Sequence, residues 1–264
     1  MKRTILLTAL AISLASANAS LATAAPGHNG HKGQISKARI FAGLDLSDIQ
    51  KQDIREIMRQ VKQDNAVYAA DIEALKAQME ALFNLETFDA ALAQDLVRLR
   101  TEQAINIELN IATAKHQAWS LLNDEQKAEF AAKQEKRAEK ERQRKALDFE
   151  RLQKRLNLTD EQSQAISDIQ EQHRDATAEL AQTLKASKDA EKALVYSNQF
   201  SEEAWLTIAQ ASQSAAIEFG VAKTQSRFDM LQVLDDEQRA KFKKIVDREQ
   251  SRKKHGKKRN KPAK

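Results

Sequence analysis

The sequence predicts an all-α protein built from two copies of one long helical hairpin. Its 264 residues include only six glycines, two prolines and no cysteine. From Leu44 to Gln250 the only glycine is Gly220, whereas sheets and α/β folds need turns with positive φ, which glycine supplies most readily. The other two observations are that sequence motifs recur at one fixed offset and that apolar residues follow a helical spacing between them.

Residues 1–24 are predicted to be a cleavable export signal. Lys2 and Arg3 precede an apolar run over residues 5–15, which is followed by small residues typical of signal-peptidase sites. The run is about half of the ~20 residues that span a bilayer; an uncleaved anchor helix is the alternative. We therefore expect a periplasmic protein, in which residues 25–43 form a flexible tail with a short helix.

This tail contains the H-x-x-H pair His28 and His31. Two histidines in a glycine-rich segment provide at most a labile metal site. The prediction is therefore a tail without bound metal, with labile binding as the alternative.

Residues 44–155 and 156–250 are predicted to be two repeats of one unit. Residues 44–50 (LDLSDIQ) recur as residues 156–162 (LNLTDEQ), and residues 122–130 recur as residues 234–242. Both pairs are offset by 112 residues, and Phe88 matches Phe200 at the same offset. Agreement at separate sites without a gap indicates an internal duplication.

Each recurring segment has the pattern of a helix capping box. In such a box a short polar side chain accepts a hydrogen bond from the amide three residues on, and a glutamine reaches back to the cap residue. The four predicted boxes pair Ser47 with Gln50, Asn123 with Gln126, Thr159 with Gln162, and Asp235 with Gln238. Each box should open a helix.

The apolar residues after each box follow the three-four spacing of a coiled-coil-like seam. We expect two helices per repeat, each more than about 30 residues long, joined by loops at residues 83–87 and 195–201. Asn65 is a polar step in the first seam that either sets its register or faces solvent. His116, His173, Trp119 and Trp205 are predicted to be packing residues.

The segments outside the seams are strongly charged. Residues 124–156 contain neither glycine nor proline and carry favourable i,i+4 charge pairs, so a continuous charged helix should join the repeats. Residues 251–264 carry eight Lys or Arg and no acid, which predicts a disordered basic tail. Two thin hairpins need a partner surface, so we expect an intramolecular pseudo-dimer or a homodimer.

Boxes of the type Leu-Thr-x-x-Gln, twice per unit in an exported helical protein, resemble the Spy/CpxP family of periplasmic stress proteins. Residues 45–58 look like that family's opening helix, and residues 87–89 (TFD) like the start of its second long helix. The resemblance implies a cradle-shaped, ATP-independent chaperone whose homodimer holds unfolded or partly folded clients on an apolar and basic concave face.

The resemblance also implies which residues face clients. Carried over by motif, they are Leu44, Leu46, Ile54, Arg55, Met58 and Arg59 in the first repeat, and Leu156, Leu158 and Ile166 in the second. The Spy cradle is rich in methionine, which suits promiscuous binding, whereas this chain has few methionines and replaces Met58 by Gln170 in the second repeat. The second repeat is therefore expected to be more structural than client-binding.

No phosphate-binding loop, nucleophile elbow or H-E-x-x-H motif occurs in the chain. The sequence therefore predicts a protein that is not an enzyme and uses no cofactor. Because the chain is expected to be exported and has no later apolar run long enough to span a bilayer, we expect no nucleic-acid partner and no membrane span. The first functional hypothesis is a periplasmic chaperone that limits aggregation during envelope stress. The alternatives are an accessory that binds an envelope-stress sensor kinase, as CpxP-like relatives do, and a structural helical spacer.

Overall fold

The computed structural model describes residues 39–145 and 153–255, which lie within one compact unit of residues 31–264. These residues form helices and turns with no strand among them, so the all-α prediction is confirmed. Within these two ranges no helix is long and apolar enough to cross a bilayer. The predicted signal peptide, His28, His31, residues 146–152 of the predicted connecting helix and the last nine residues lie outside the described ranges.

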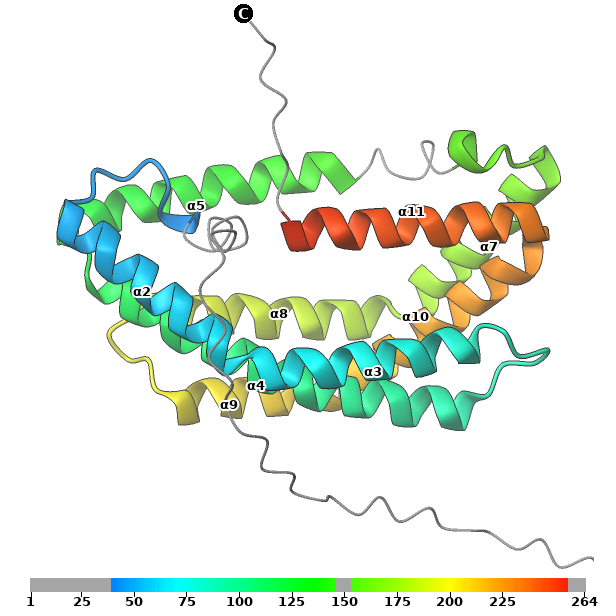
Figure 1. Ribbon diagram of the computed structural model, residues 1–264, viewed down its shortest axis with the longest axis horizontal. Helices are drawn as coiled ribbons and strands as arrows, with labels where there is room; N and C mark the ends of the chain where they lie inside the picture. The colour runs from blue at the N-terminus through cyan, green and yellow to red at the C-terminus, as the bar shows by residue number, and fades with distance from the viewer. Residues whose placement is uncertain (1–38, 146–152, 256–264) are drawn as a thin grey trace, which may run out of the picture. The chain divides into compact units, whose positions relative to one another are not determined.

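Each repeat contributes a hairpin and a further helix (Figure 1). The first repeat contains η1 (Arg39–Phe41), α2 (Asp48–Asp64), α3 (Ala66–Leu82), α4 (Ala90–Ser120) and α5 (Asp124–Lys145). The second contains α7 (Asp160–Ala176), α8 (Ala178–Val195), α9 (Glu202–Ala211), α10 (Gln213–Val233) and α11 (Asp236–His255). Because α11 continues to His255, the start of the predicted disordered tail is helical.

The prediction of long unbroken helices is wrong for three of the four hairpin arms. Asn65 separates α2 from α3, and Thr177 separates α7 from α8 at the equivalent position of the second repeat. Ser212 separates α9 from α10, whereas α4 runs unbroken for 31 residues. All three break residues are buried polar side chains, and side chains that hydrogen-bond to nearby backbone groups bend helices.

Two of the three side chains hydrogen-bond to a carbonyl of their own helix, and the third bonds to a neighbouring helix. Thr177 Oγ1 donates to the carbonyl oxygen of His173 at 2.7 Å, and Ser212 Oγ donates to that of Ala209 at 3.1 Å. Asn65 Oδ1 accepts from Asn110 Nδ2 at 2.8 Å across to α4. Asn65 therefore does not face solvent; its buried side chain connects the first arm of the hairpin to α4.

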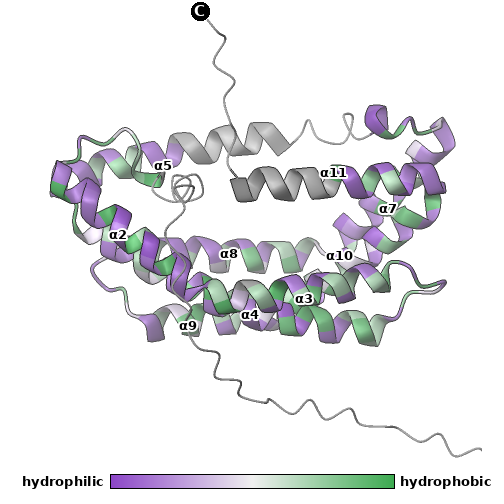
Figure 2. Ribbon diagram, in the orientation of Figure 1, coloured by the Kyte–Doolittle hydropathy of each residue, from purple (hydrophilic) through white to green (hydrophobic). Residues whose placement is uncertain are grey.

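Hydrophobic and hydrophilic residues are interspersed along the helices (Figure 2), and the apolar ones form cores where helices pack on one another. In the first repeat, one core joins α2 to the end of α4 and the start of α5 around Ile54, Ala118 and Phe130. The equivalent core of the second repeat forms around Ile166 and Leu234. A third cluster joins the repeats, because Ala112 of α4 packs with Val195 of α8 and with Trp205 and Ala209 of α9.

The repeats pack on one another in a pseudo-symmetric way. The ring of Phe88 lies 5.5 Å from that of Phe228, and the ring of the equivalent Phe200 lies 4.6 Å from that of His116. Since Phe228 and His116 are themselves equivalent, exchanging the repeats turns one contact into the other. This is the geometry of a two-fold interface in which one patch meets its own copy, and here both patches belong to one chain.

Candidate functional site

The four capping boxes do more than begin helices, because their glutamines meet in pairs. In the first repeat Gln50 Nε2 donates to Gln126 Oε1 at 2.9 Å, and Gln126 Nε2 donates back to Gln50 Oε1 at 3.1 Å. Each Nε2 also donates to a backbone carbonyl, of Leu121 and Asp45 respectively. The oxygens accept from the backbone N–H groups of Ser47 and Asn123, so both amides use all their hydrogen-bonding capacity.

The second repeat has the same arrangement. Gln162 and Gln238 exchange hydrogen bonds of 2.8 and 2.9 Å. Gln162 Nε2 donates to the carbonyl oxygen of Val233 at 3.0 Å, and Gln238 Nε2 reaches that of Asn157 at 3.5 Å. The glutamines thus join the beginning of the hairpin to the end of its second arm, which makes them structural residues.

The structure does not place the apolar client-facing candidates on an open surface. Five of these candidates are buried in the cores of their own repeats, with a relative exposure of 8% or less: Leu44, Ile54, Met58, Leu156 and Ile166. Leu46 and Leu158 are partly buried against the same cores. The expectation that these residues form an exposed surface is therefore wrong, because each apolar stripe packs against its own second arm.

Arg55 and Arg59 are exposed on α2. Arg59 pairs with Glu56 on the same helix and also donates to Gln63. The hydrogen bond from Arg59 lowers the pKa of the Glu56 carboxyl. Neither arginine lines a cavity described below, so the structure brings these two basic candidates to solvent but not together with an apolar surface.

Two adjoining cavities lie where the tip of the first hairpin meets the second repeat. They share Met79, Phe83, Arg100 and Arg227. The larger, of about 650 Å³, is bounded by α3 and the turn after it, α4, α10 and α11. Its main apolar walls are Leu75, Met79, Phe83, Leu96, Leu231 and Phe242. The smaller, of about 340 Å³, continues toward α8 and α9.

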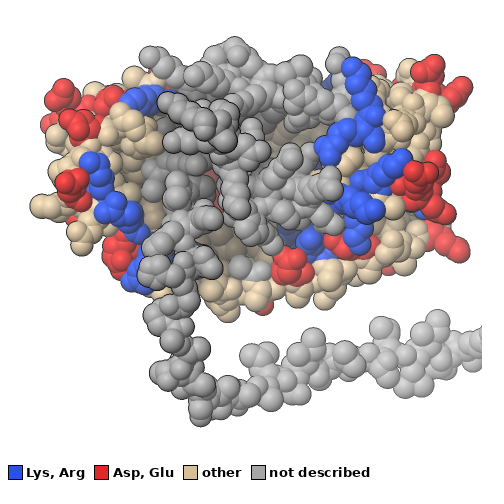
Figure 3. Space-filling model, turned by 45° about the horizontal axis from the view of Figure 1, so that its top comes forward, with Lys and Arg blue, Asp and Glu red and all other residues tan. Residues whose placement is uncertain are grey.

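The larger cavity is basic as well as apolar. Five Lys or Arg residues and three Glu residues line it, and Figure 3 shows Lys and Arg side chains gathered on the side of the molecule where α11 begins. The Arg227 guanidinium lies 4.6 Å from the ring centroid of Phe83 and 5.7 Å from that of Phe242, within reach of cation–π attraction. Arg239 Nε donates to the carbonyl oxygens of Leu231 and Leu234.

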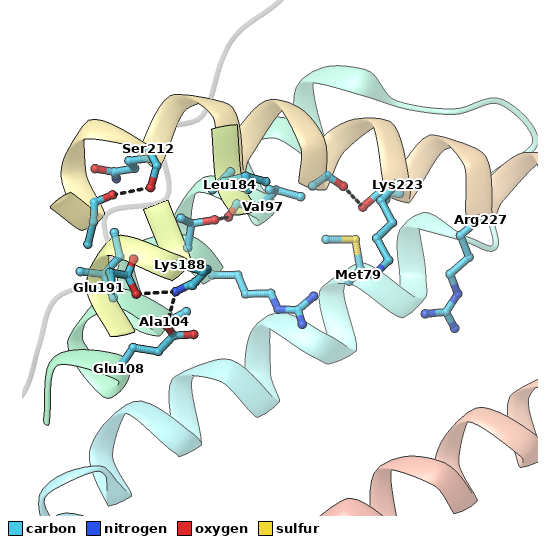
Figure 4. A pocket seen from close by; sticks show the side chains of 18 of the residues that line it. Met79, Val97, Ala104, Glu108, Leu184, Lys188, Glu191, Ser212, Lys223 and Arg227 are labelled. Atoms are coloured by element: carbon cyan, nitrogen blue, oxygen red, sulfur yellow. Dashed lines mark hydrogen bonds and ion pairs between the residues drawn. The ribbon is translucent and has the colours of Figure 1, made fainter. Parts of the chain in front are cut away.

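The smaller cavity ends at a charged cluster that links the repeats (Figure 4). Lys188 of α8 pairs with Glu108 of α4 and, at 3.0 Å, with Glu191, which is only 6% exposed. Burial lowers the pKa of Lys188, but the hydrogen bonds and charges of both glutamates outweigh it and raise the pKa overall. For neighbouring Lys115, burial dominates and lowers the pKa.

Sequence reasoning missed Phe83, Arg227 and Phe242 as members of one site. A usable signal was present in the duplication itself, since equivalent positions carry different residues. Phe83 and Arg100 correspond to Val195 and Ser212, whereas Phe242 has a phenylalanine, Phe130, at its equivalent position and gave no such signal. Within the described ranges, no group of three or more His, Asp or Glu side chains is arranged to hold a metal ion.

Comparison with known proteins gives one family. The model of the LTXXQ motif family matches residues 32–134 and again residues 144–246. No solved structure matches the chain. The two matched segments cover most of the chain and contain all four capping boxes and both glutamine pairs. The chain therefore belongs to the LTXXQ motif family, that of Spy and CpxP, and carries the family unit twice.

Proposed function

We propose that this protein is an ATP-independent periplasmic chaperone that binds unfolded or partly folded proteins and limits their aggregation during envelope stress. Membership of the LTXXQ family supports a general stress-related role in the periplasm. Proteins of this family are in general chaperone-like and not enzymes. The more specific proposal, that this chain binds clients, requires an accessible apolar surface on this chain.

The observation that carries the proposal is the pair of adjoining cavities. Unfolded chains expose apolar side chains, and burial of such groups is favourable by about 25 cal/mol for each Å². Leu85 at the rim is 41% exposed, and Met79, shared by both cavities, has the flexible thioether side chain that adapts to varied partners. Arg100 pairs with no acid among the described residues, so it remains available to acidic client groups.

Release needs no nucleotide in this scheme. A client held by a small apolar area and a few exposed charges binds weakly, and it leaves when its own folding removes the segment from the cavity. Linkage then favours the folded client as soon as that state is the more stable.

The proposal is tested by light scattering of a chemically denatured model protein diluted into buffer without ATP. The mature chain should suppress aggregation at stoichiometric amounts. Leu85→Asp should weaken suppression because it places a charge at the apolar rim. Leu99→Asp is a matched control, since Leu99 is 38% exposed and lines neither cavity.

Equal suppression by both variants would remove the cavities from the mechanism. Absence of suppression by the unaltered chain would contradict the chaperone function. If that chain instead bound the periplasmic domain of an envelope-stress sensor kinase, the signalling accessory role would replace it.

A further inference from the structure

The paired repeats have two equivalent ends, which differ in how well they are packed. At the filled end, Phe130 of α5 meets Tyr196 at the hairpin tip of the second repeat. At the open end, Phe242 of α11 and Asn84 at the hairpin tip of the first repeat line the larger cavity. Phe130 of the first repeat and Phe242 of the second occupy equivalent positions. Phe130 is only 2% exposed, because its ring stacks on Phe41 at 5.3 Å and meets the ring of Tyr196 edge-on at 4.9 Å. Phe242 is half-buried and lines the larger cavity.

Two substitutions between the repeats account for this difference. The position equivalent to Phe41 is Gln153, and the position equivalent to Tyr196 is Asn84. Asn84 lines the larger cavity. Thus the hairpin tip of the first repeat carries a short amide where that of the second carries a phenol ring. Among the described residues, no aromatic ring packs on Phe242 as Phe41 and Tyr196 pack on Phe130.

The open end has basic side chains at two positions where the filled end has uncharged ones. Arg100 and Lys243 line the larger cavity, and their equivalents in the filled end are the uncharged Ser212 and Ala131. Lys243 pairs with Glu80 at 3.3 Å, whereas Arg100 has no acidic partner among the described residues. Because three glutamates also line the larger cavity, the open end is distinguished by the unpaired guanidinium of Arg100 and not by a greater net positive charge.

We propose that the open end binds an aromatic side chain of an extended client segment that carries Asp or Glu beside it. The aromatic ring would pack against Phe242 and Phe83, as Tyr196 and Phe41 pack against Phe130, and the neighbouring carboxylates face Arg100. This proposal rests on the chaperone function proposed above and names the client chemistry that the site selects.

The chain's own undescribed segments offer one competitor. Among residues 1–38, 146–152 and 256–264, the only aromatic residue is Phe149. The basic C-terminal segment has no aromatic residue and repels a basic cavity. The test therefore includes Phe149.

The experiment measures fluorescence anisotropy of a labelled, otherwise Gly/Ser peptide with a central Asp-Phe-Glu, titrated with the mature chain. Replacing the peptide's Phe by Ala should weaken binding by about tenfold, because the ring is the main anchor. The Asn-Phe-Gln peptide should bind more weakly than Asp-Phe-Glu at low salt and nearly equally at high salt, where charges are screened.

Variants of the protein locate the binding. Asn84→Tyr supplies the ring that Tyr196 gives to the other end, and it should weaken binding of Asp-Phe-Glu by about tenfold. Asn198→Tyr is the matched control, because Asn198 is an exposed residue of the other hairpin tip; it should leave binding unchanged. Arg100→Gln should abolish the preference for the acidic peptide.

Three results would overturn the proposal: no binding of Asp-Phe-Glu, equal binding by Asn84→Tyr and the unaltered chain, or equal binding of the Phe and Ala peptides. A gain of about tenfold on Phe149→Ala would also overturn it, because Phe149 would then be the occupant. Suppression of aggregation by the unaltered chain, measured in parallel, separates failure of this proposal from failure of the chaperone function.

Discussion

Gln50 and Gln126 form a two-amide junction in which every donor and acceptor has a partner. Gln126 is only 9% exposed, and an amide lost from such a place leaves several partners unsatisfied. Asp45, Asn123 and Gln50 would all lose a hydrogen bond. The signature glutamine of the motif is therefore explained by the stability of the repeat, without reference to any ligand.

Gln126→Ala should lower the free energy of unfolding by about 2–3 kcal/mol, since a buried unsatisfied group costs about 1–3 kcal/mol. Gln238→Ala should cost less, because Gln238 Nε2 lies 3.5 Å from the Asn157 carbonyl, against 2.6 Å for Gln126 and Asp45. Urea unfolding measures both. Gln52→Ala, at an exposed position of α2, is the control and should change stability by less than ~0.5 kcal/mol.

His173 is predicted to make stability depend on pH. Burial lowers its pKa below the usual 6.5, and Lys223 lowers it further. Its ring packs beside Phe219. The folded state therefore favours the neutral ring: stability is fully present above the ordinary pKa and falls with pH below it, because the unfolded chain takes up the proton more readily.

His173→Val, which copies the equivalent Val61, should reduce this loss. Urea midpoints at about pH 7 and pH 5 should differ less for the variant than for the unaltered chain. An identical pH dependence of the two proteins would show that His173 does not contribute.

At the scale of the element, the crossing of α4 and α10 depends on Gly220. A β-carbon placed there would lie 2.6 Å from Val97 Cγ1, closer than real contacts allow. Val97 is 6% exposed, and a valine in a helix has one strongly preferred rotamer, so it cannot turn away. The glycine, which costs about 1 kcal/mol within a helix, is retained for this close approach between the repeats.

Gly220→Ala should therefore destabilise the protein by about 1–3 kcal/mol despite its better helix propensity. The double variant Val97→Ala with Gly220→Ala should recover much of that loss. A double-mutant cycle on unfolding free energies measures the coupling; additive effects would show that the two residues do not collide.

Comparison of elements also shows what sequence reasoning can and cannot reach. Capping boxes were predictable because their hydrogen bonds connect residues three apart, as Ser47 and Gln50 do. The helix breaks were not, because Thr177 and Ser212 are acceptable on a helix surface and only burial against another helix reveals their effect. Likewise, the spacing of Ile54 and Met58 predicts an apolar helix face. It does not tell whether that face packs against another helix of the same repeat or stays exposed to bind a client.

At the scale of the whole molecule, the contacts between repeats predict one cooperative unit. Trp205 of the second repeat is 2% exposed and packs in a cluster with Ala112 of the first. Lys188 and Glu108 add an ion pair across the same interface. Opening one repeat would therefore expose apolar surface of the other and break an ion pair between them.

The two tryptophans allow this to be measured, since Trp119 and Trp205 lie in different repeats. Trp119→Phe and Trp205→Phe each leave one fluorescent reporter. For each variant, the unfolding free energy is plotted against the urea concentration relative to that variant's midpoint. The two plots should have the same slope if the repeats unfold together as one two-state unit. A shallower slope for either reporter would indicate independent repeats.

Having both halves in one gene has an evolutionary consequence. In an assembly of identical subunits every mutation arrives twice, so an alteration that opens one end opens the other as well. Here Asn84 and Tyr196 could diverge separately. One end can keep its ring contacts while the other accumulates substitutions that change what it binds. A duplicated chain can therefore specialise one end, which a symmetric homodimer cannot do.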